Sequence, residues 1–346
     1  MKKRSGLALA VGAAGLVSGV VAERAAVRRR HERDLERDAE LGSRRGERSR
    51  TIRLRDGAGT FVEEVGPRRA RRGVVFVNGS ALRTDMWHYQ MAGLGGHRLV
   101  FYDLRGHGAS RPKGEADYSI KQLADDLLEV IEDCKLDEVV IVGHSVGGMI
   151  GMQLCLDHPE LVDRVVKGLV LCNSTYGPAI ETFIGGALIA RVERLTRRPF
   201  DGLLAHSRRI DYLRRIVKPS DAMFWGVAFA AFGPNASARQ IDFVYDMVAE
   251  TSSDVIFELV KSYRDFDARG RLDEIGVSVL VIGGEHDRLT LPEASEYLAD
   301  HLPKAELHIL EGAGHMSMLE RYERVNEMLE RFFDDVLGRP KTGAAS

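Results

Sequence analysis

Three side chains that together could carry out nucleophilic catalysis lie far apart in the sequence. Ser145 is at the centre of the motif GHSVG, Asp287 lies in EHDRL, and His315 lies in GAGHM. Each follows a short apolar run typical of a buried strand. A serine hydroxyl becomes an effective nucleophile when an imidazole takes its proton and a carboxylate orients that imidazole. We therefore expect Ser145 as nucleophile, His315 as base and Asp287 as the orienting carboxylate.

The surroundings of Ser145 indicate a tight turn between a strand and a helix. The β-branched run VVIV precedes the motif, and a helix-forming pattern begins at Val146. Gly143 and Gly147 flank the serine at positions where chain segments nearly touch and side chains do not fit. The backbone N–H of Val146, together with that of Ser80 in an earlier loop, is expected to bind the oxyanion of a tetrahedral intermediate.

The elements that must position these side chains alternate between strand and helix. A hairpin precedes apolar runs of the kind found in strands covered on both faces. The expected strands are 51–55, 61–65, 73–78, 97–103, 137–143, 167–173, 277–284 and 306–310. The expected helices are 84–92, 120–133, 146–158, 291–301 and 316–337. This order predicts an α/β fold with a mostly parallel central sheet, and parallel strands bring the loops that follow them to one edge.

One interval is too long for an ordinary connection between strands. About 90 helix-rich residues separate the strand ending near Asn173 from the next, which predicts an inserted helical cap. The expected divisions are core 51–175, cap 176–268, core 269–338 and a disordered tail 339–346. In the cap, Phe224, Trp225 and Phe229 are expected either to form core or to line an apolar acyl-binding wall. Between 191 and 218 the cap carries nine Lys and Arg against three acids, either a solvated face or a contact for anionic lipid.

Four stretches together resemble a known superfamily. GHSVGG, YDLRGHGAS, GEHDRLTLP and GAGHMSMLE match the layout of the α/β-hydrolases, and specifically of capped, lipase- or esterase-like serine members. The resemblance extends from about Thr51 to Leu337. Where that superfamily usually has a His-Gly pair after its third strand, this chain has Asn78-Gly79, which we expect to contact substrate. An oxyanion hole built from N–H groups does not need the replaced imidazole.

The resemblance implies a serine hydrolase that cleaves carboxylic esters, with a probe-reactive Ser145 and an apolar acyl group in its substrate. It also admits a thioesterase, a carbon–carbon bond hydrolase or a cofactor-free perhydrolase with the same three residues. Haloalkane dehalogenases and epoxide hydrolases are disfavoured because they place an aspartate where this chain has Ser145. A ligand-binding member without catalysis is the remaining alternative, distinguished by ester turnover.

Composition sets limits on partners and cofactors. The 346 residues carry 49 Lys and Arg against 51 Asp and Glu, a net charge of −2, which offers no general attraction for nucleic acid. The three cysteines are scattered, and we expect them in the core and not in a disulfide or metal site. No group of ligands has metal spacing and no glycine loop has the phosphate-binding pattern, so no cofactor is expected.

The N-terminal region has its own pattern. Residues 6–22 are uncharged, a stretch of about 17 residues at the lower limit for spanning a bilayer. The arginines at 28–30 favour a membrane anchor that leaves the catalytic part in the cytoplasm. A cleaved signal of a secreted protein and a flexible tail of a soluble cytoplasmic one are the alternatives. Residues 23–50, dense in charge, are expected to form a solvated linker that completes an N-terminal region of 1–50.

Overall fold

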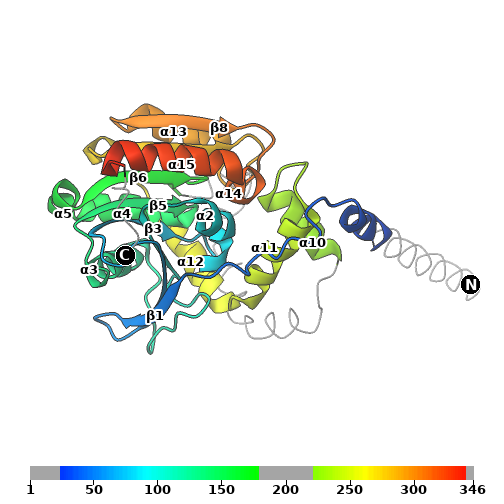
Figure 1. Ribbon diagram of the computed structural model, residues 1–346, viewed down its shortest axis with the longest axis horizontal. Helices are drawn as coiled ribbons and strands as arrows, with labels where there is room; N and C mark the ends of the chain where they lie inside the picture. Colours follow the sequence, from blue (N-terminus) through cyan, green and yellow to red (C-terminus); the bar gives the residue numbers. More distant parts are fainter. Residues whose placement is uncertain (1–23, 179–220, 340–346) are drawn as a thin grey trace, which may run out of the picture.

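The computed structural model describes residues 24–178 and 221–339. Its centre is an eight-stranded sheet in the order β1-β2-β4-β3-β5-β6-β7-β8 (Figure 1). The strands are β1 Arg48–Arg53, β2 Gly59–Val65, β3 Arg72–Val77, β4 Arg98–Tyr102, β5 Glu138–His144, β6 Val166–Cys172, β7 Ser278–Gly284 and β8 Ala305–Leu310. β2 pairs antiparallel with both β1 and β4, and every other neighbouring pair is parallel. The α/β fold predicted from the sequence is confirmed.

The helices pack on the sheet and beside it. They are α2 His88–Gly93, α3 Ile120–Asp133, α4 Val146–Asp157, α5 Pro159–Arg164, α10 Asp221–Ala231, α11 Ala238–Glu250, α12 Ser253–Asp265, α13 Pro292–His301, α14 Ser317–Glu320 and α15 Tyr322–Leu337, with 3-10 turns η1 Thr84–Trp87 and η2 Leu272–Glu274. The single helix expected over 316–337 is divided at Arg321, and α5 had no counterpart among the expected helices.

Alternating strand residues build two apolar layers. Val75 and Val77 of β3 belong to a cluster with α3 and α4, whereas Val74 and Phe76 belong to a cluster with α2 and α15. Successive side chains of a strand point to opposite faces, so a strand that is apolar throughout is covered on both sides. These layers hold the parallel strands in register and so fix where the loops after them lie.

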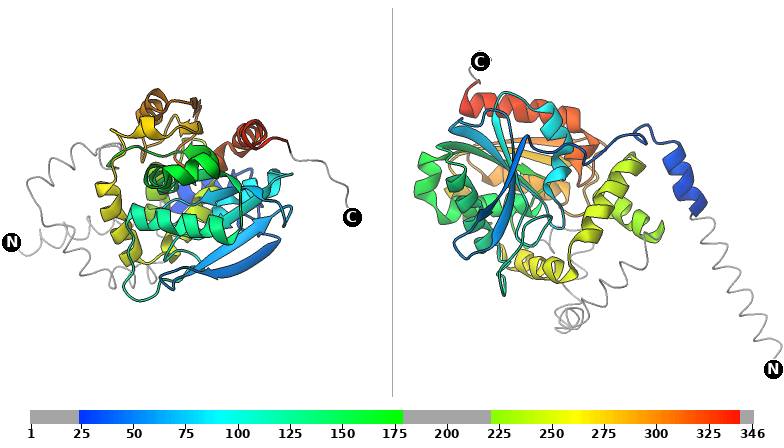
Figure 2. Two further views of the ribbon diagram at one scale, coloured as in Figure 1. Left: turned by 90° about the vertical axis from the view of Figure 1, so that its left-hand side faces the viewer. Right: turned by 60° about the horizontal axis from the view of Figure 1, so that its bottom comes forward.

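Helices α10, α11 and α12 lie at one end of the sheet, on the same side as the N-terminal arm, which we define as residues 24–47 (Figures 1 and 2). The arm is helical over residues 24–32 and packs on α11. His31 bonds to Asp242 at 2.7 Å, and Asp34 accepts the backbone N–H of Arg239 at 2.7 Å. This differs from the solvated linker expected over residues 23–50, because charges that lack partners within the arm find them on the helix.

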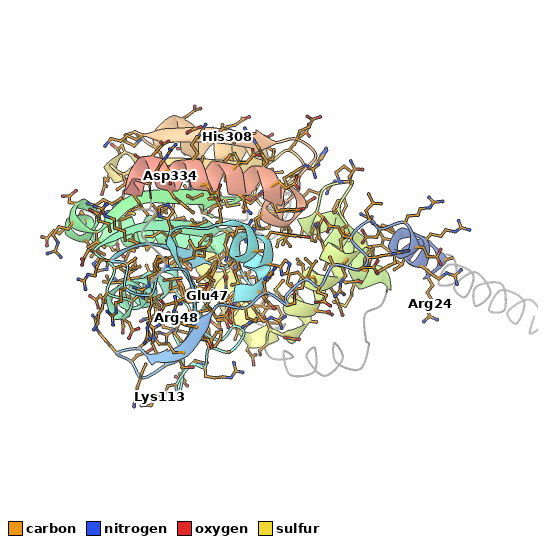
Figure 3. The ribbon with its side chains drawn as sticks, in the orientation of Figure 1. Arg24, Glu47, Arg48, Lys113, His308 and Asp334 are labelled. Carbon is orange, nitrogen blue, oxygen red and sulfur yellow. The ribbon has the colours of Figure 1, made fainter. Side chains whose placement is uncertain are left out.

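Polar and charged side chains lie around the outside of the structure (Figure 3). Lys113 and His308 illustrate this at opposite sides of the view, and His308 lies on the edge strand β8, where it bonds to Glu306. Polar and charged side chains on an edge strand discourage pairing with another chain. Among the residues that the structure describes, none forms a helix long and apolar enough to cross a bilayer. The expected anchor, 6–22, and the basic segment, 191–218, lie outside the described residues.

Candidate active site

Ser145 occupies the corner between β5 and α4 in an unusual backbone conformation. Its φ is 53° and its ψ is −119°, in the left-handed half of the map where a side chain is strained. The end of β6 holds this conformation: the N–H of Ser145 donates to the oxygen of Cys172 at 2.9 Å, and Ser174 Oγ donates to the oxygen of Ser145 at 2.8 Å. Ser145 remains partly exposed.

The two glycines of the GHSVG motif are required by the approach of neighbouring backbone. A Cβ at Gly143 would lie 2.4 Å from the carbonyl carbon of Gly147. A Cβ at Gly147 would lie 2.3 Å from the oxygen of Val77, at the end of β3. Neither contact is sterically tolerable, so the tight corner predicted from the motif depends on both residues lacking a side chain.

Asp287 and His315 form a buried hydrogen-bonded pair. His315 Nδ1 lies 2.9 Å from Asp287 Oδ2 and 3.1 Å from Oδ1. Their exposed fractions are 5% for His315 and 2% for Asp287. Because a carboxylate only accepts hydrogen bonds, Nδ1 of His315 carries the ring proton. The other ring nitrogen, Nε2, can then take a proton from a nucleophile.

Asp287 is held as an ion by several donors. Leu289 and Thr290 donate their N–H to Oδ1 at 2.9 Å, and the Thr290 hydroxyl and Asn173 Nδ2 donate to Oδ2 at 2.7 and 2.9 Å. Burial alone would raise the pKa of Asp287. The charge and hydrogen bond of His315, with these donors, outweigh burial and lower the pKa below its usual value.

Ser145 and His315 are connected through His144, the last residue of β5. His144 Nε2 donates to the backbone oxygen of His315 at 3.0 Å, and the two imidazole rings are 4.8 Å apart. The structure therefore brings the corner that carries Ser145 into contact with the loop that carries His315.

The two expected oxyanion donors lie in different settings. Val146 is the first residue of α4, so its N–H has no acceptor within the helix. Ser80 lies in the loop after β3, followed by Ala81, whose φ of 61° is left-handed. This loop is fixed because Ala81 N–H donates to His107 Nε2 at 3.0 Å and Thr84 N–H donates to Asp103 Oδ1 at 2.8 Å.

Asn78 and Gly79 precede that loop and are both buried. Asn78 Nδ2 donates to the oxygen of Tyr102 at 3.0 Å, and Asn78 Oδ1 accepts from Trp87 Nε1 at 2.9 Å. A Cβ at Gly79 would lie 2.5 Å from His144 Nδ1. The Asn78 amide thus anchors the loop to β4 and η1, and this placement favours a supporting role for it over direct contact with substrate.

The three aromatic residues expected in the cap wall lie on α10 in different settings. Phe224 is buried, with its ring 5.5 Å from that of His31 in the N-terminal arm. Trp225 is half-buried beneath the guanidinium of Arg30, 5.5 Å away. Phe229 is 59% exposed and lies 4.5 Å from the guanidinium of Arg288.

Three supporting residues of the site were not assigned these roles from the sequence. Asn173, which follows β6, donates to Asp287 at 2.9 Å and to the oxygen of Gly314 at 3.1 Å. Thr290 lies three residues after Asp287. This spacing allows a local side-chain turn, and it was the signal in the sequence that could have identified Thr290 as a partner of Asp287. Glu320, whose side chain accepts the N–H of Gly314 at 2.8 Å, had no signal in the sequence.

Within residues 24–178 and 221–339, no group of three or more His, Cys, Asp or Glu side chains has the geometry of a metal site. Cys134, Cys155 and Cys172 are free and buried. Burial raises the pKa of the Cys155 and Cys172 thiols to about 12, so neither is a thiolate near neutral pH.

Known proteins resemble this chain over the region that contains the candidate active site. The sequence model described as the Alpha/beta hydrolase family matches residues 74–328. The putative carbamate hydrolase RutD of Agrobacterium fabrum is 28% identical over 247 residues, 71% of this chain and 87% of that protein. The 3-oxoadipate enol-lactonase 2 of Acinetobacter baylyi is 25% identical over 262 residues, 75% of this chain and 88% of that protein. The solved structure of Est816, an N-acyl homoserine lactone degrading enzyme, is 25% identical with a TM-score of 0.63, covering 82% of this chain and all of that one.

Proposed function

The chain belongs to the alpha/beta hydrolase family, and we propose that it is a serine hydrolase that cleaves carboxylic ester bonds through an acyl-enzyme. The observation that carries this proposal is the bond between His315 Nδ1 and Asp287, because it fixes the imidazole tautomer whose Nε2 can take a proton. The strained corner at Ser145, one residue from the side chain that contacts His315, supports it.

The proposed reaction has two stages. Ser145 Oγ attacks the ester carbonyl carbon while its proton passes to His315 Nε2, and the carbonyl oxygen becomes an oxyanion facing the N–H groups of Val146 and Ser80. The alcohol leaves with the proton from His315, and the acyl group stays on Ser145. Water then repeats the sequence, with His315 as base, and releases the acid. Asp287 stays ionised and stabilises the imidazolium throughout.

The relatives refine the choice of test substrates. Those compared act, by their names, on a carbamate, an enol-lactone and an acyl homoserine lactone, all of which have a carbonyl carbon bonded to oxygen. We therefore propose open-chain and cyclic esters as the substrate class, with an apolar acyl group. A thioesterase, a carbon–carbon bond hydrolase and a perhydrolase use the same proton transfers and are included in the test.

The test compares the wild type with Ser145→Ala and with Ser49→Ala, an exposed serine on β1. A fluorophosphonate probe should label the wild type and Ser49→Ala, and should not label Ser145→Ala. Turnover of p-nitrophenyl esters of increasing acyl length should fall at least about a thousandfold in Ser145→Ala. Equal labelling of all three proteins contradicts the assignment of the nucleophile, and a wild type that turns over only a thioester, a diketone or peroxide substrate selects one of the alternatives.

We retain the prediction that residues 6–22 attach the protein to a membrane. The supporting observation is the sequence pattern. The arm that follows is bonded through Arg30 to the oxygen of Ala236, just before α11, and through His31 to Asp242 on α11. A deletion should therefore end at residue 22 to keep these contacts. The full chain should sediment with membranes and the truncated chain should not; equal recovery of both in the supernatant contradicts the anchor.

A further inference from the structure

The carboxylate of Glu320 connects two segments that meet beside the candidate base. Glu320, the last residue of α14, accepts the backbone N–H of Gly314 at 2.8 Å through Oε1 and that of Gly233 at 2.8 Å through Oε2. Gly314 directly precedes His315, and Gly233 lies two residues after the end of α10. One side chain thus holds the histidine loop and the end of a cap helix at once.

The two segments are also in direct backbone contact. The N–H of Met316 donates to the oxygen of Ala231 at 3.0 Å. A Cβ at Gly314 would lie 2.4 Å from the carbonyl carbon of Phe232, so no side chain fits between them. Because Met316 is bonded to the end of α10 and Gly314 packs against the residue that follows it, we expect a displacement of α10 to reach the imidazole of His315.

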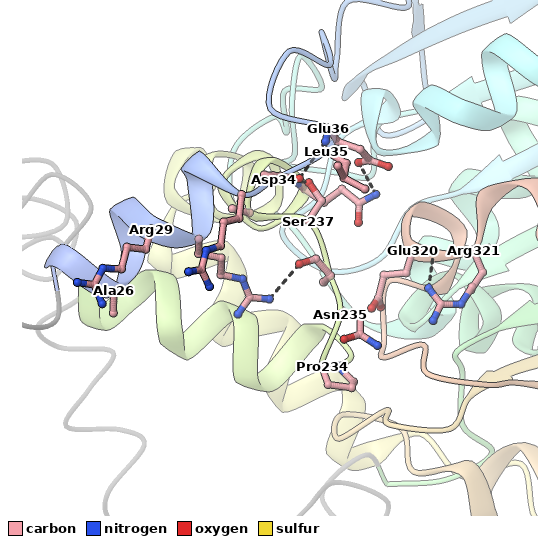
Figure 4. Close-up of a pocket in the computed structure, with 15 residues that line it drawn as sticks. Ala26, Arg29, Asp34, Leu35, Glu36, Pro234, Asn235, Ser237, Glu320 and Arg321 are labelled. Carbon is pink, nitrogen blue, oxygen red and sulfur yellow. Dashed lines mark hydrogen bonds between the residues drawn. The ribbon is translucent and has the colours of Figure 1, made fainter.

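The charge of Glu320 has few nearby compensating groups. Burial raises its pKa to about 7, although its two N–H donors and the charge of Arg321 lower it and Asp287 raises it further. Glu320 also lines a cavity of about 830 Å³ whose other side is the N-terminal arm (Figure 4). The charged residues of the arm that line it are Arg29, Arg30, Arg33, Asp34 and Glu36. This cavity gives the carboxylate a route to exchange protons with solvent.

We propose that Glu320 is a positioning residue that couples the position of α10 to the orientation of the His315 imidazole. The proposal rests on the proposed function, since it takes His315 as the base. The ionised carboxylate accepts both N–H groups. When one oxygen is protonated it becomes a hydrogen-bond donor and a weaker acceptor, so its bond to one of the two backbone N–H groups is weakened. Proton uptake therefore weakens one of the two connections and loosens the imidazole.

The experiment compares Glu320→Gln with the wild type and with Glu311→Gln, an exposed glutamate three residues before Gly314. Glutamine resembles the protonated acid, because its amide group places a donor against one N–H. At pH 8.5 we expect the kcat of Glu320→Gln for a p-nitrophenyl ester to fall about ten- to a hundredfold, as for a small misplacement of a catalytic group, with KM changed less than about twofold. Glu311→Gln should match the wild type.

The pH dependence distinguishes positioning from a merely structural role. The ratio of wild-type kcat to Glu320→Gln kcat cancels the titration of His315 itself. This ratio should rise through about pH 7, from near one at pH 5.5 to its full value at pH 8.5, because only the ionised carboxylate accepts both bonds at full strength. A constant ratio, or equal kcat for the two proteins at pH 8.5, overturns the proposal.

A second measurement does not depend on catalysis. Hydrogen exchange of the peptides that contain Gly233 and Gly314 should be faster in Glu320→Gln than in Glu311→Gln, at equal thermal stability or after correction for it. Unchanged exchange at both glycines overturns the proposal even if the wild type hydrolyses no ester. A wild type without probe labelling, combined with faster exchange in Glu320→Gln, instead contradicts the proposed function and leaves the connection through Glu320 supported.

Discussion

The imidazole of His144 donates from Nε2 to the backbone oxygen of His315 at 3.0 Å, so the residue before the candidate nucleophile supports the loop of the candidate base. Burial, and then the charge of His315, lower the pKa of His144 to about 3. Its Nδ1 has no hydrogen-bond partner among the described residues. His144 is therefore a neutral donor near neutral pH, and not a second base.

This relationship predicts different outcomes for two substitutions of His144. His144→Leu removes the donor and leaves the oxygen of His315 buried without its partner, which should cost about 1–3 kcal/mol of unfolding free energy. His144→Gln keeps an N–H donor and should cost less. Urea denaturation monitored by tryptophan fluorescence measures both, and equal losses would show that the hydrogen bond does not matter to stability.

A second prediction concerns His107 and Ala81, which we expect to stabilise the loop carrying Ser80. His107→Leu keeps a similar volume but leaves the buried N–H of Ala81 without an acceptor, which should cost about 1–3 kcal/mol. The kcat for an ester should fall because the oxyanion donor is no longer held. His301→Leu, an exposed histidine on α13, is the control and should change neither quantity appreciably.

The pH dependence of the same variant has a definite sign. Burial lowers the pKa of His107 to about 4, although its hydrogen bond to the oxygen of Arg105 raises it. As pH falls from about 6.5 to 4, the unfolded chain binds a proton that the folded chain does not, so the wild type loses up to about 1.4 kcal/mol per pH unit from this group. The stability difference between wild type and His107→Leu should therefore shrink as the solution is acidified; a difference that grows contradicts the neutral, buried state.

A third prediction concerns the glycine after the nucleophile. Gly147→Ala places a methyl group 2.3 Å from the backbone oxygen of Val77, which no side-chain movement can relieve. We expect the corner at Ser145 to distort and fluorophosphonate labelling to slow by at least about tenfold. Gly276→Ala, at an exposed site with nothing within 4 Å of the added carbon, should label at the wild-type rate. Equal rates for both variants contradict the close packing of the corner.

A fourth prediction concerns the N-terminal arm. His31 Nδ1 lies 2.9 Å from the oxygen of Val27, and Nε2 lies 2.7 Å from Asp242 Oδ2. Both partners only accept hydrogen bonds, so both bonds form together only when both ring nitrogens carry protons. Burial lowers the pKa of His31, but its hydrogen bonds with Val27 and Asp242 and the charge of Asp242 raise it by more.

Asp242→Asn should therefore lower the pKa of His31, measured by NMR titration of the imidazole, whereas Asp246→Asn on the same helix should not. Because the folded pKa is raised, the stability that the ion pair contributes is fully present below about pH 6.5 and is lost as pH rises through the folded value. The pair is more than one-third exposed, so this contribution should stay below about 1 kcal/mol. An unchanged His31 pKa in Asp242→Asn contradicts the ion pair.

The sequence predicted the arrangement of the core well because local patterns there agree with the final structure. The helix expected over 120–133 is α3 with the same bounds, and each expected strand has its counterpart in the sheet. Strands covered on both faces are apolar throughout, and helices between them begin and end at recognisable residues. The long apolar helix α4, buried on nearly every side, was found from its position after the glycine motif.

The N-terminal arm shows where such reasoning fails. Its density of charge is typical of a solvated linker, and nothing in residues 23–50 indicates a partner. The partners, Asp242 and the first turn of α11, lie about 200 positions later in the chain. Complementary charges that are distant in sequence leave no local pattern, so only the folded structure reveals that they pair.

By itself the sequence identified the candidates for the proposed chemistry, Ser145, Asp287 and His315, because each follows a strand and parallel strands bring their ends together. Only the tertiary structure decided what holds them: Asn173 and Thr290 on the carboxylate, His144 on the histidine loop, and Glu320 between that loop and α10. The physical reason is that the apolar pattern of a strand is contained in a few neighbouring residues of the sequence. A buried hydrogen bond depends on two atoms that meet only when the whole chain has folded.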